Sequence, residues 1–101
     1  MKTTTVIIAA VTCLFGSTLV LAGTAAEGEK KAAPCVSCHG LNGKSTNPNN
    51  PSLKGQQKNY LVKSLQAYRD KKREDPMMNS LSASLTDADI DDIATYYSSL
   101  K

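Results

Sequence analysis

Apolar residues recur with a helical period in two segments of the second half of the chain. From about Gln57 to Lys72, one face carries a row of aromatic, aliphatic and small residues with lysines opposite: Tyr60, Leu61, Ser64, Leu65 and Tyr68. Near the C-terminus the spacing i, i+3, i+4 and i+7 is met by Ile90, Ile93, Ala94 and Tyr97. Both patterns predict amphipathic helices. The alternation typical of strands is not found, so we expect an all-α fold.

Local signals set the expected limits of these helices. Thr86-Asp87-Ala88-Asp89 has the form of a capping box and predicts the start of the last helix. Asp75-Pro76 is expected to end the preceding helix, with an irregular segment from there to about Leu85. The cations Lys71, Lys72 and Arg73 would then lie in the last turn of that helix, where they suit its dipole.

The first half of the chain is less regular. Glu27 to Ala33 predicts a short polar helix, which Pro34 would kink. Residues 40–56 are rich in glycine, proline and asparagine, and their apolar residues follow neither a helical nor a strand period. A loop of that length is unusual in a small domain unless it is functional or wraps a ligand.

The N-terminus has the three-part pattern of a secretory signal peptide: a short basic start, an apolar run from Val6 to Leu21, and small residues after it. We expect residues 1–22 to be the signal peptide, cleaved after Ala22, with Ala26 as the second choice. An uncleaved membrane anchor is the alternative, because the run approaches spanning length. Cys13 would leave with the signal peptide, and residues 23–101 would form one exported domain.

Composition limits the function classes. The formal net charge of +3 is small, and no basic stripe with interleaved aromatic residues is present, so we expect no nucleic-acid partner. Tryptophan is absent and aromatic residues make up 5% of the chain. A domain this small with so few large apolar side chains is expected to need an added stabiliser.

Cys35-Val36-Ser37-Cys38-His39 matches the attachment pattern of a c-type haem. On one helical turn, positions i, i+3 and i+4 share a face, so both thiols can form thioethers with one side of a porphyrin while His39 points at its iron. A thiol–disulfide oxidoreductase would need a strand–helix–strand scaffold. A zinc site would need a fourth ligand. Both are less favoured.

The second axial ligand is open from the residues alone. His39 is the only histidine in the chain, which excludes a second histidine from the same chain. Methionine, another weak ligand, water or no ligand remain. Once the signal peptide is removed, the only methionines are Met77 and Met78.

Taken together, these motifs resemble those of the small bacterial class I cytochromes c, and of one half of the two-haem periplasmic cytochromes. The resemblance is carried by Gly28, Cys35–Gly40, Pro51–Gln56, Tyr60-Leu61, Leu85–Ile90 and Ala94–Tyr97. It implies three main helices and long loops wrapped around one covalent haem c. It also implies that the distal ligand stands seven residues before Leu85, which is Met78, with Met77 as second choice.

The resemblance implies further roles. Gly28 would pack against Tyr96 or Tyr97, and the carbonyl of Pro48 is the candidate acceptor for the imidazole of His39. Ala32 departs from the family pattern, since relatives often carry an aromatic residue there, which puts the packing of the first helix in doubt.

An iron with histidine and methionine ligands has no open position, which suits electron transfer rather than catalysis. We therefore expect a periplasmic one-electron carrier that is not an enzyme. Its partners would be redox proteins (a respiratory complex, oxidase or reductase) met transiently, with no stable membrane insertion after cleavage. Lys71, Lys72 and Arg73 are a candidate docking patch for an acidic partner. The alternative is a haem enzyme, or a gas- or peroxide-binding protein, with an open distal site.

Overall fold

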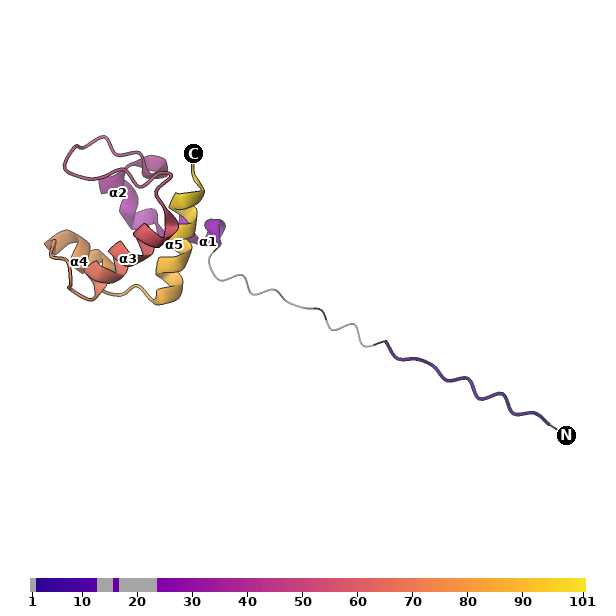
Figure 1. The fold of residues 1–101 in the computed structure, drawn as a ribbon. Helices are drawn as coiled ribbons and strands as arrows, with labels where there is room; N and C mark the ends of the chain where they lie inside the picture. The colour runs from indigo at the N-terminus through magenta and orange to yellow at the C-terminus, as the bar shows by residue number, and fades with distance from the viewer. Residues whose placement is uncertain (1, 13–15, 17–23) are drawn as a thin grey trace.

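The computed structural model describes residues 2–12, 16 and 24–101. Residues 2–12 form neither helix nor strand (Figure 1). The predicted cleavage position after Ala22 and the side chain of Cys13 lie outside the described residues. Among the residues that are described, no helix has the length and apolarity needed to cross a membrane.

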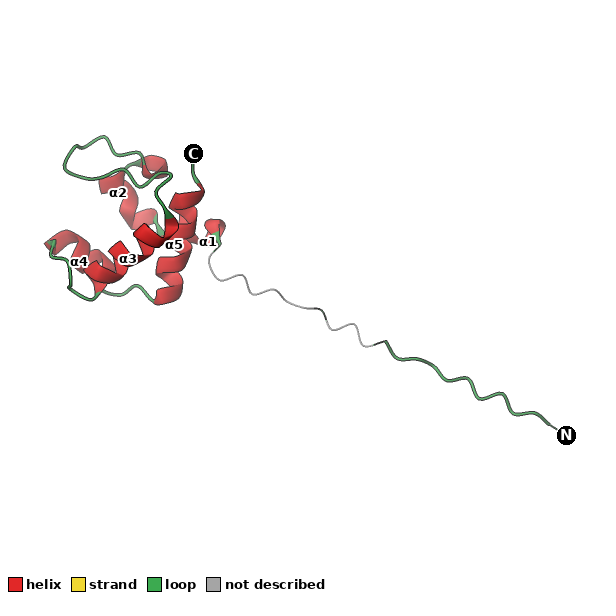
Figure 2. Cartoon of the chain, viewed as in Figure 1, coloured by secondary structure: helices red, strands yellow, loops and turns green. Residues whose placement is uncertain are grey.

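The described part of the chain is helical and contains no strand (Figure 2), which confirms the all-α prediction. Its α-helices are α1 (Ala25–Lys31), α2 (Val36–His39), α3 (Lys58–Arg69), α4 (Pro76–Ser82) and α5 (Asp87–Ser99). Two short 3₁₀ turns, Ala33–Cys35 and Leu41–Gly43, flank α2. A long loop then joins the second turn to α3 (Figure 1).

Helix α5 forms the centre of the core. Its predicted apolar stripe is buried, since Ile90, Ile93, Ala94 and Tyr97 are all 2% exposed or less. The capping box is also present: Oγ1 of Thr86 accepts from the N–H of Asp89, and the Asp89 carboxylate accepts from the N–H of Thr86. The prediction of this helix from its stripe and cap is confirmed.

Helix α1 packs on α5 at Gly28, as expected. A Cβ at Gly28 would lie 2.7 Å from Cβ of Tyr96 and would collide with the carbonyl oxygen of Asp92. Only glycine permits so close an approach of the two helices. Ala32 is 1% exposed within the core cluster, so α1 packs well without the aromatic residue that relatives often carry there.

The end of α3 differs from the prediction. The helix stops at Arg69, and Lys71 adopts a left-handed backbone conformation with φ of +58°. The N–H groups of Lys72 and Arg73 then bond back to the carbonyl oxygen of Ala67. The three cations therefore follow the helix instead of lying in its last turn, because the chain reverses direction there.

The segment after Asp75 also differs: we expected it to be irregular, and it contains α4. Asp75 is the N-cap of this helix, and its carboxylate accepts from the N–H groups of Met77 and Met78. Pro76 occupies the first turn, where its missing N–H costs no hydrogen bond and its φ suits a helix. Asp75-Pro76 therefore starts a helix here, whereas the sequence alone predicted only the end of the preceding helix.

Candidate functional site

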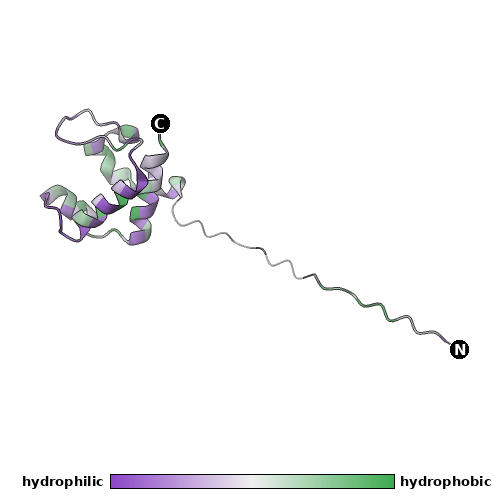
Figure 3. Cartoon of the chain, viewed as in Figure 1, coloured by the Kyte–Doolittle hydropathy of each residue, from purple (hydrophilic) through white to green (hydrophobic). Residues whose placement is uncertain are grey.

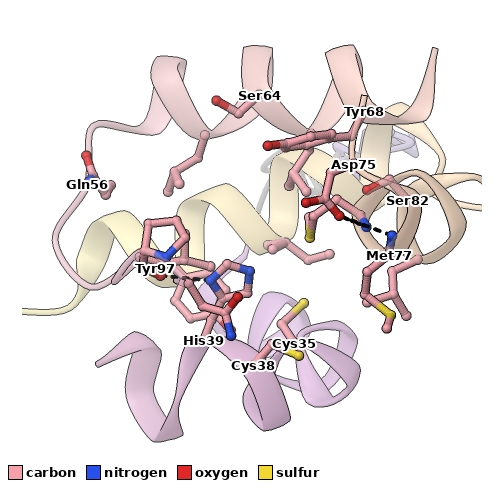
Figure 4. Close-up of a pocket in the computed structure, with 18 of the residues that line it drawn as sticks. Cys35, Cys38, His39, Gln56, Ser64, Tyr68, Asp75, Met77, Ser82 and Tyr97 are labelled. Carbon is pink, nitrogen blue, oxygen red and sulfur yellow. Dashed lines mark hydrogen bonds between the residues drawn. The ribbon is translucent and has the colours of Figure 1, made fainter. Parts of the chain in front are cut away.

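A cavity of about 560 Å³ lies between the Cys-His turn and the helices α3 and α4, with residues of α5 also in its wall (Figure 4). Its volume is within the range of pockets that bind organic ligands. The predicted face of α3 lines it, including Leu61, Ser64 and Tyr68. The loop that precedes α3 contributes Asn49 to Leu53 and Gln56. The long loop is therefore a wall of this cavity, in line with its expected role.

The three residues of the Cys-His motif come together on one wall. Cys35 ends the 3₁₀ turn, and Cys38 and His39 lie in α2, so one short helical stretch carries all three. All of them line the cavity (Figure 4). Both cysteines are half-buried free thiols. Burial raises the pKa of the Cys35 thiol.

His39 is held in one orientation. The side chain is buried, and its Nδ1 lies 2.8 Å from the carbonyl oxygen of Pro51. A carbonyl oxygen can only accept, so Nδ1 carries the proton and donates, which leaves Nε2 with a free lone pair. The expectation that Pro48 supplies this carbonyl is wrong. Pro51 is the acceptor because the loop returns past His39. Twelve residues after His39, the loop brings the carbonyl of Pro51 against the imidazole ring.

The two methionines line the cavity from α4, across from the Cys-His turn, as Figure 4 shows for Met77. Their surroundings differ, since Met77 is 60% exposed and Met78 is half-buried. The N-cap of Asp75 and the side chain of Asn79 hold this helix. Nδ2 of Asn79 donates to the carbonyl oxygens of Tyr68 and Arg73, at 2.8 Å each. Sequence reasoning missed Asn79, because its partners follow from the turn after α3.

Two buried hydroxyl groups in the cavity wall have no hydrogen-bond partner among the described residues: those of Ser82 and Tyr97. Each side chain is 1% exposed. Unpaired buried hydroxyls are unusual in proteins, so these two oxygens lack a partner that the described residues could supply. Two thiols can attach a porphyrin covalently, and an imidazole nitrogen and a thioether sulfur are groups that can bind its iron. The residues present therefore fit a haem group.

The charged side chains that line the cavity come from three places: Lys31 of α1, Arg73 of the turn after α3, and Asp75 at the start of α4. The guanidinium of Arg73 lies 4.5 Å above the ring of Tyr68, and both residues line the cavity. Lys71 and Lys72 are exposed. Arg69 is engaged with Asp70 and Asp87, and these hydrogen bonds raise the pKa of its guanidinium further above its ordinary value.

Comparison with known proteins agrees with this site. Residues 25–101 match the cytochrome c family model. The chain belongs to the cytochrome c family, whose members hold haem c covalently and use it to carry electrons.

Its relatives are bacterial. Cytochrome c-554(548) of Halomonas halodenitrificans is 47% identical over 81 residues, covering 77% of this chain and 98% of the relative. Cytochrome c4 of Pseudomonas aeruginosa is 46% identical over 80 residues, covering 79% of this chain and 40% of the relative. The chain thus spans nearly all of the first protein and about two fifths of the second.

A solved structure shows the same fold. Reduced recombinant cytochrome c4 from Pseudomonas stutzeri matches with a TM-score of 0.75 and 39% sequence identity, covering 79% of this chain and 47% of that one. The class I cytochrome c fold, and the likeness to one half of a two-haem cytochrome, are confirmed. These relatives indicate a haem c electron carrier and do not favour the alternative of a haem enzyme.

Proposed function

We propose that residues 23–101 are a periplasmic one-electron carrier, released from a signal peptide formed by residues 1–22. One haem c would be attached through Cys35 and Cys38, with His39 and Met78 as axial ligands. The observation that carries this proposal is the cavity itself: the Cys-His turn lies on one wall and the methionines of α4 lie across from it.

The proximal side is supported by the state of His39. Its Nδ1 donates to Pro51, so Nε2 is the nitrogen available for iron. The same hydrogen bond holds the ring plane and increases the donor strength of the ring. Because Cys35 and Cys38 are free thiols one helical turn apart in the same wall, both sulfurs are available for attachment.

Burial favours Met78 over Met77 as the distal ligand. A ligating thioether must turn away from solvent, and Met77 is 60% exposed whereas Met78 is half-buried. Both are N-terminal residues of α4, and the Asp75 carboxylate binds the N–H groups of both. The cap therefore orients this turn of the helix.

Haem supplies the one-electron iron couple when it is bound. The side chains of His39 and Met78 would occupy both axial positions, which leaves no iron site for a substrate and argues against catalysis. A thioether ligand favours the reduced state and so raises the reduction potential. The packed wall from α3 and α5 keeps water away from this site and limits the rearrangement that accompanies electron transfer.

Partner encounters would be brief and involve a small interface. The rim of the cavity exposes Tyr60, Met77 and Leu81, which are 54%, 60% and 39% exposed. Arg73 lines the same cavity, and Lys71 and Lys72 just before it are exposed. These cations support a docking patch for an acidic redox protein such as a respiratory complex, oxidase or reductase.

Export is supported by the N-terminal segment. Its apolar side chains Val6, Ile7, Ile8 and Val11 are all at least 77% exposed and take no part in the core. Figure 3 shows the N-terminal segment lying apart from the helices. A segment that adds nothing to the folded domain can be removed without loss of stability, as signal cleavage requires.

The test uses protein matured in a host with haem-attachment machinery. An alkaline pyridine spectrum is expected to show one haem with both vinyl groups converted to thioethers. The ferric protein is expected to show a near-infrared band for thioether-to-iron charge transfer. Met78→Ala should abolish that band and Met77→Ala should retain it. The opposite pattern would exclude Met78 as the ligand, and a parent protein without the band that binds added ligands readily would favour the open-site alternative.

A further inference from the structure

Tyr97 presents a hydroxyl group that the fold buries but does not pair. The residue is 1% exposed and lines the cavity, and its oxygen makes no hydrogen bond to any described residue. Leaving a buried hydroxyl unpaired costs about 1–3 kcal/mol. Phenylalanine would fill the same space at no such cost, so the oxygen is expected to have a role.

The ring of Tyr97 cannot swing to find water. Its edge packs against the backbone of Gly43, where a Cβ would lie 2.7 Å from Cδ1 of the ring. Its other neighbour is the ring of Tyr96, with centroids 4.9 Å apart and a tilt of 49°. The carbonyl oxygen of Tyr97 also accepts from the N–H of Gly55, which ties the end of α5 to the loop. The phenol is therefore held in place at the cavity wall.

The sulfur of Cys35 is the neighbouring group that can use this hydroxyl. Cys35 packs against the core cluster that contains Tyr97, and both residues line the cavity. Burial raises the pKa of Tyr97, so the phenol keeps its proton at neutral pH and remains a donor. A thioether sulfur has no proton and can only accept.

We infer that Tyr97 is a positioning residue whose hydroxyl donates a hydrogen bond to Sγ of Cys35 in the haem-loaded protein and thereby raises the reduction potential. The inference rests on the proposed attachment of haem through Cys35. The positive end of the O–H dipole points at the sulfur that is bonded to the haem, so it stabilises the state that has gained an electron. Hydrogen bonds around a haem are among the means by which a protein adjusts its potential.

Tyr97→Phe removes the oxygen and keeps the ring, and Tyr96→Phe is the matched control. Tyr96 is the next residue of the same helix, and its hydroxyl donates to Asn42 at 3.4 Å near the surface. Both variants are matured to the haem-loaded form. Three quantities are measured on each: the reduction potential by spectroelectrochemistry, the carbon–sulfur stretching band by resonance Raman, and the thermal unfolding midpoint.

Tyr97→Phe is expected to lower the ratio of reduced to oxidised protein at a fixed potential by about two- to tenfold, as a net hydrogen bond of about 0.5–1.5 kcal/mol allows. For one electron, tenfold corresponds to 59 mV. The carbon–sulfur band should shift and the unfolding midpoint should fall. Tyr96→Phe should change the ratio by less than about twofold and leave the band in place.

Two results would overturn the inference. If Tyr97→Phe leaves both potential and band unchanged, or unfolds at a higher temperature than the parent, the hydroxyl is unpaired in the haem-loaded protein too. If Tyr96→Phe produces the same shifts, the effect does not come from a bond to Cys35. The pyridine spectrum of the parent protein distinguishes these two results from a failure of the proposed function. If the parent has no thioether-linked haem, the proposed attachment is refuted, and the inference with it.

Discussion

Asn79 ties the helix that carries Met78 to the end of α3, and Asn79→Ala is expected to loosen that helix. Its side chain makes three hydrogen bonds: it donates to the carbonyl oxygens of Tyr68 and Arg73, and it accepts from the N–H of Asp75 at 2.9 Å. Alanine keeps the helix-forming backbone and removes all three. The variant therefore removes both bonds that attach α4 to the end of α3, together with one bond at the start of α4 itself.

The magnitude follows from these bonds. Each contributes about 0.5–1.5 kcal/mol, and water can replace the two that are exposed more easily than the half-buried bond to Tyr68. The expected loss is therefore near the lower end of the sum, about 1.5–2 kcal/mol. With Met78 as the proposed distal ligand, that energy would raise the population in which Met78 has left the iron by roughly 10- to 30-fold.

Added imidazole measures this population, because it binds ferric iron only when the methionine is displaced. Its apparent affinity rises by the same factor as the competent population. The near-infrared band of the Met–iron bond provides the readout during a titration. Ser80→Ala, at an exposed position of the same helix, is the control and should leave the affinity unchanged. If Asn79→Ala changes the affinity by less than about twofold, or no more than Ser80→Ala, the hydrogen bonds of Asn79 do not hold Met78 in place.

Two further predictions concern the contact of α1 with α5. Gly28→Ala places a methyl group 2.7 Å from Cβ of Tyr96, so it should destabilise the haem-loaded protein by about 1–3 kcal/mol in urea unfolding. The control is Glu29→Ala, which faces solvent on the same helix and should leave the stability unchanged. If both variants lose the same stability, the close packing at Gly28 is not the cause. The hydrogen bond from Lys31 lowers the pKa of Asp92 below its ordinary value of 3.8. A lowered pKa stabilises the fold above 3.8 and stops doing so as the pH falls through the folded value. The difference in unfolding free energy between the parent and Lys31→Met should therefore be constant near neutral pH and shrink below pH 3.8. If the difference persists in acid, the ion pair between Lys31 and Asp92 is not the source of that stability.

The apolar stripe of α5, its capping box and the Cys-His turn could all be predicted from the sequence, because each depends on residues within two helical turns of one another. The signal-like N-terminus is likewise a local pattern, although its cleavage remains a prediction. The glycine contact of α1 was expected only through the resemblance to cytochromes c, and the packing of Gly28 against Tyr96 bears it out.

What only the tertiary structure decided depends on residues far apart in the chain. The carbonyl that binds His39 belongs to Pro51 rather than Pro48, since the path of a loop without any period sets which carbonyl arrives. Helix α4 exists because Asp75 caps it and because Asn79 finds carbonyl partners in the turn after α3. The hydroxyl of Tyr97 lies at a position that the stripe alone describes as apolar. Only the tertiary packing of α5 shows that this oxygen is buried without a partner beside the cavity, because helical periodicity determines which side of a helix is buried but not what lies against it.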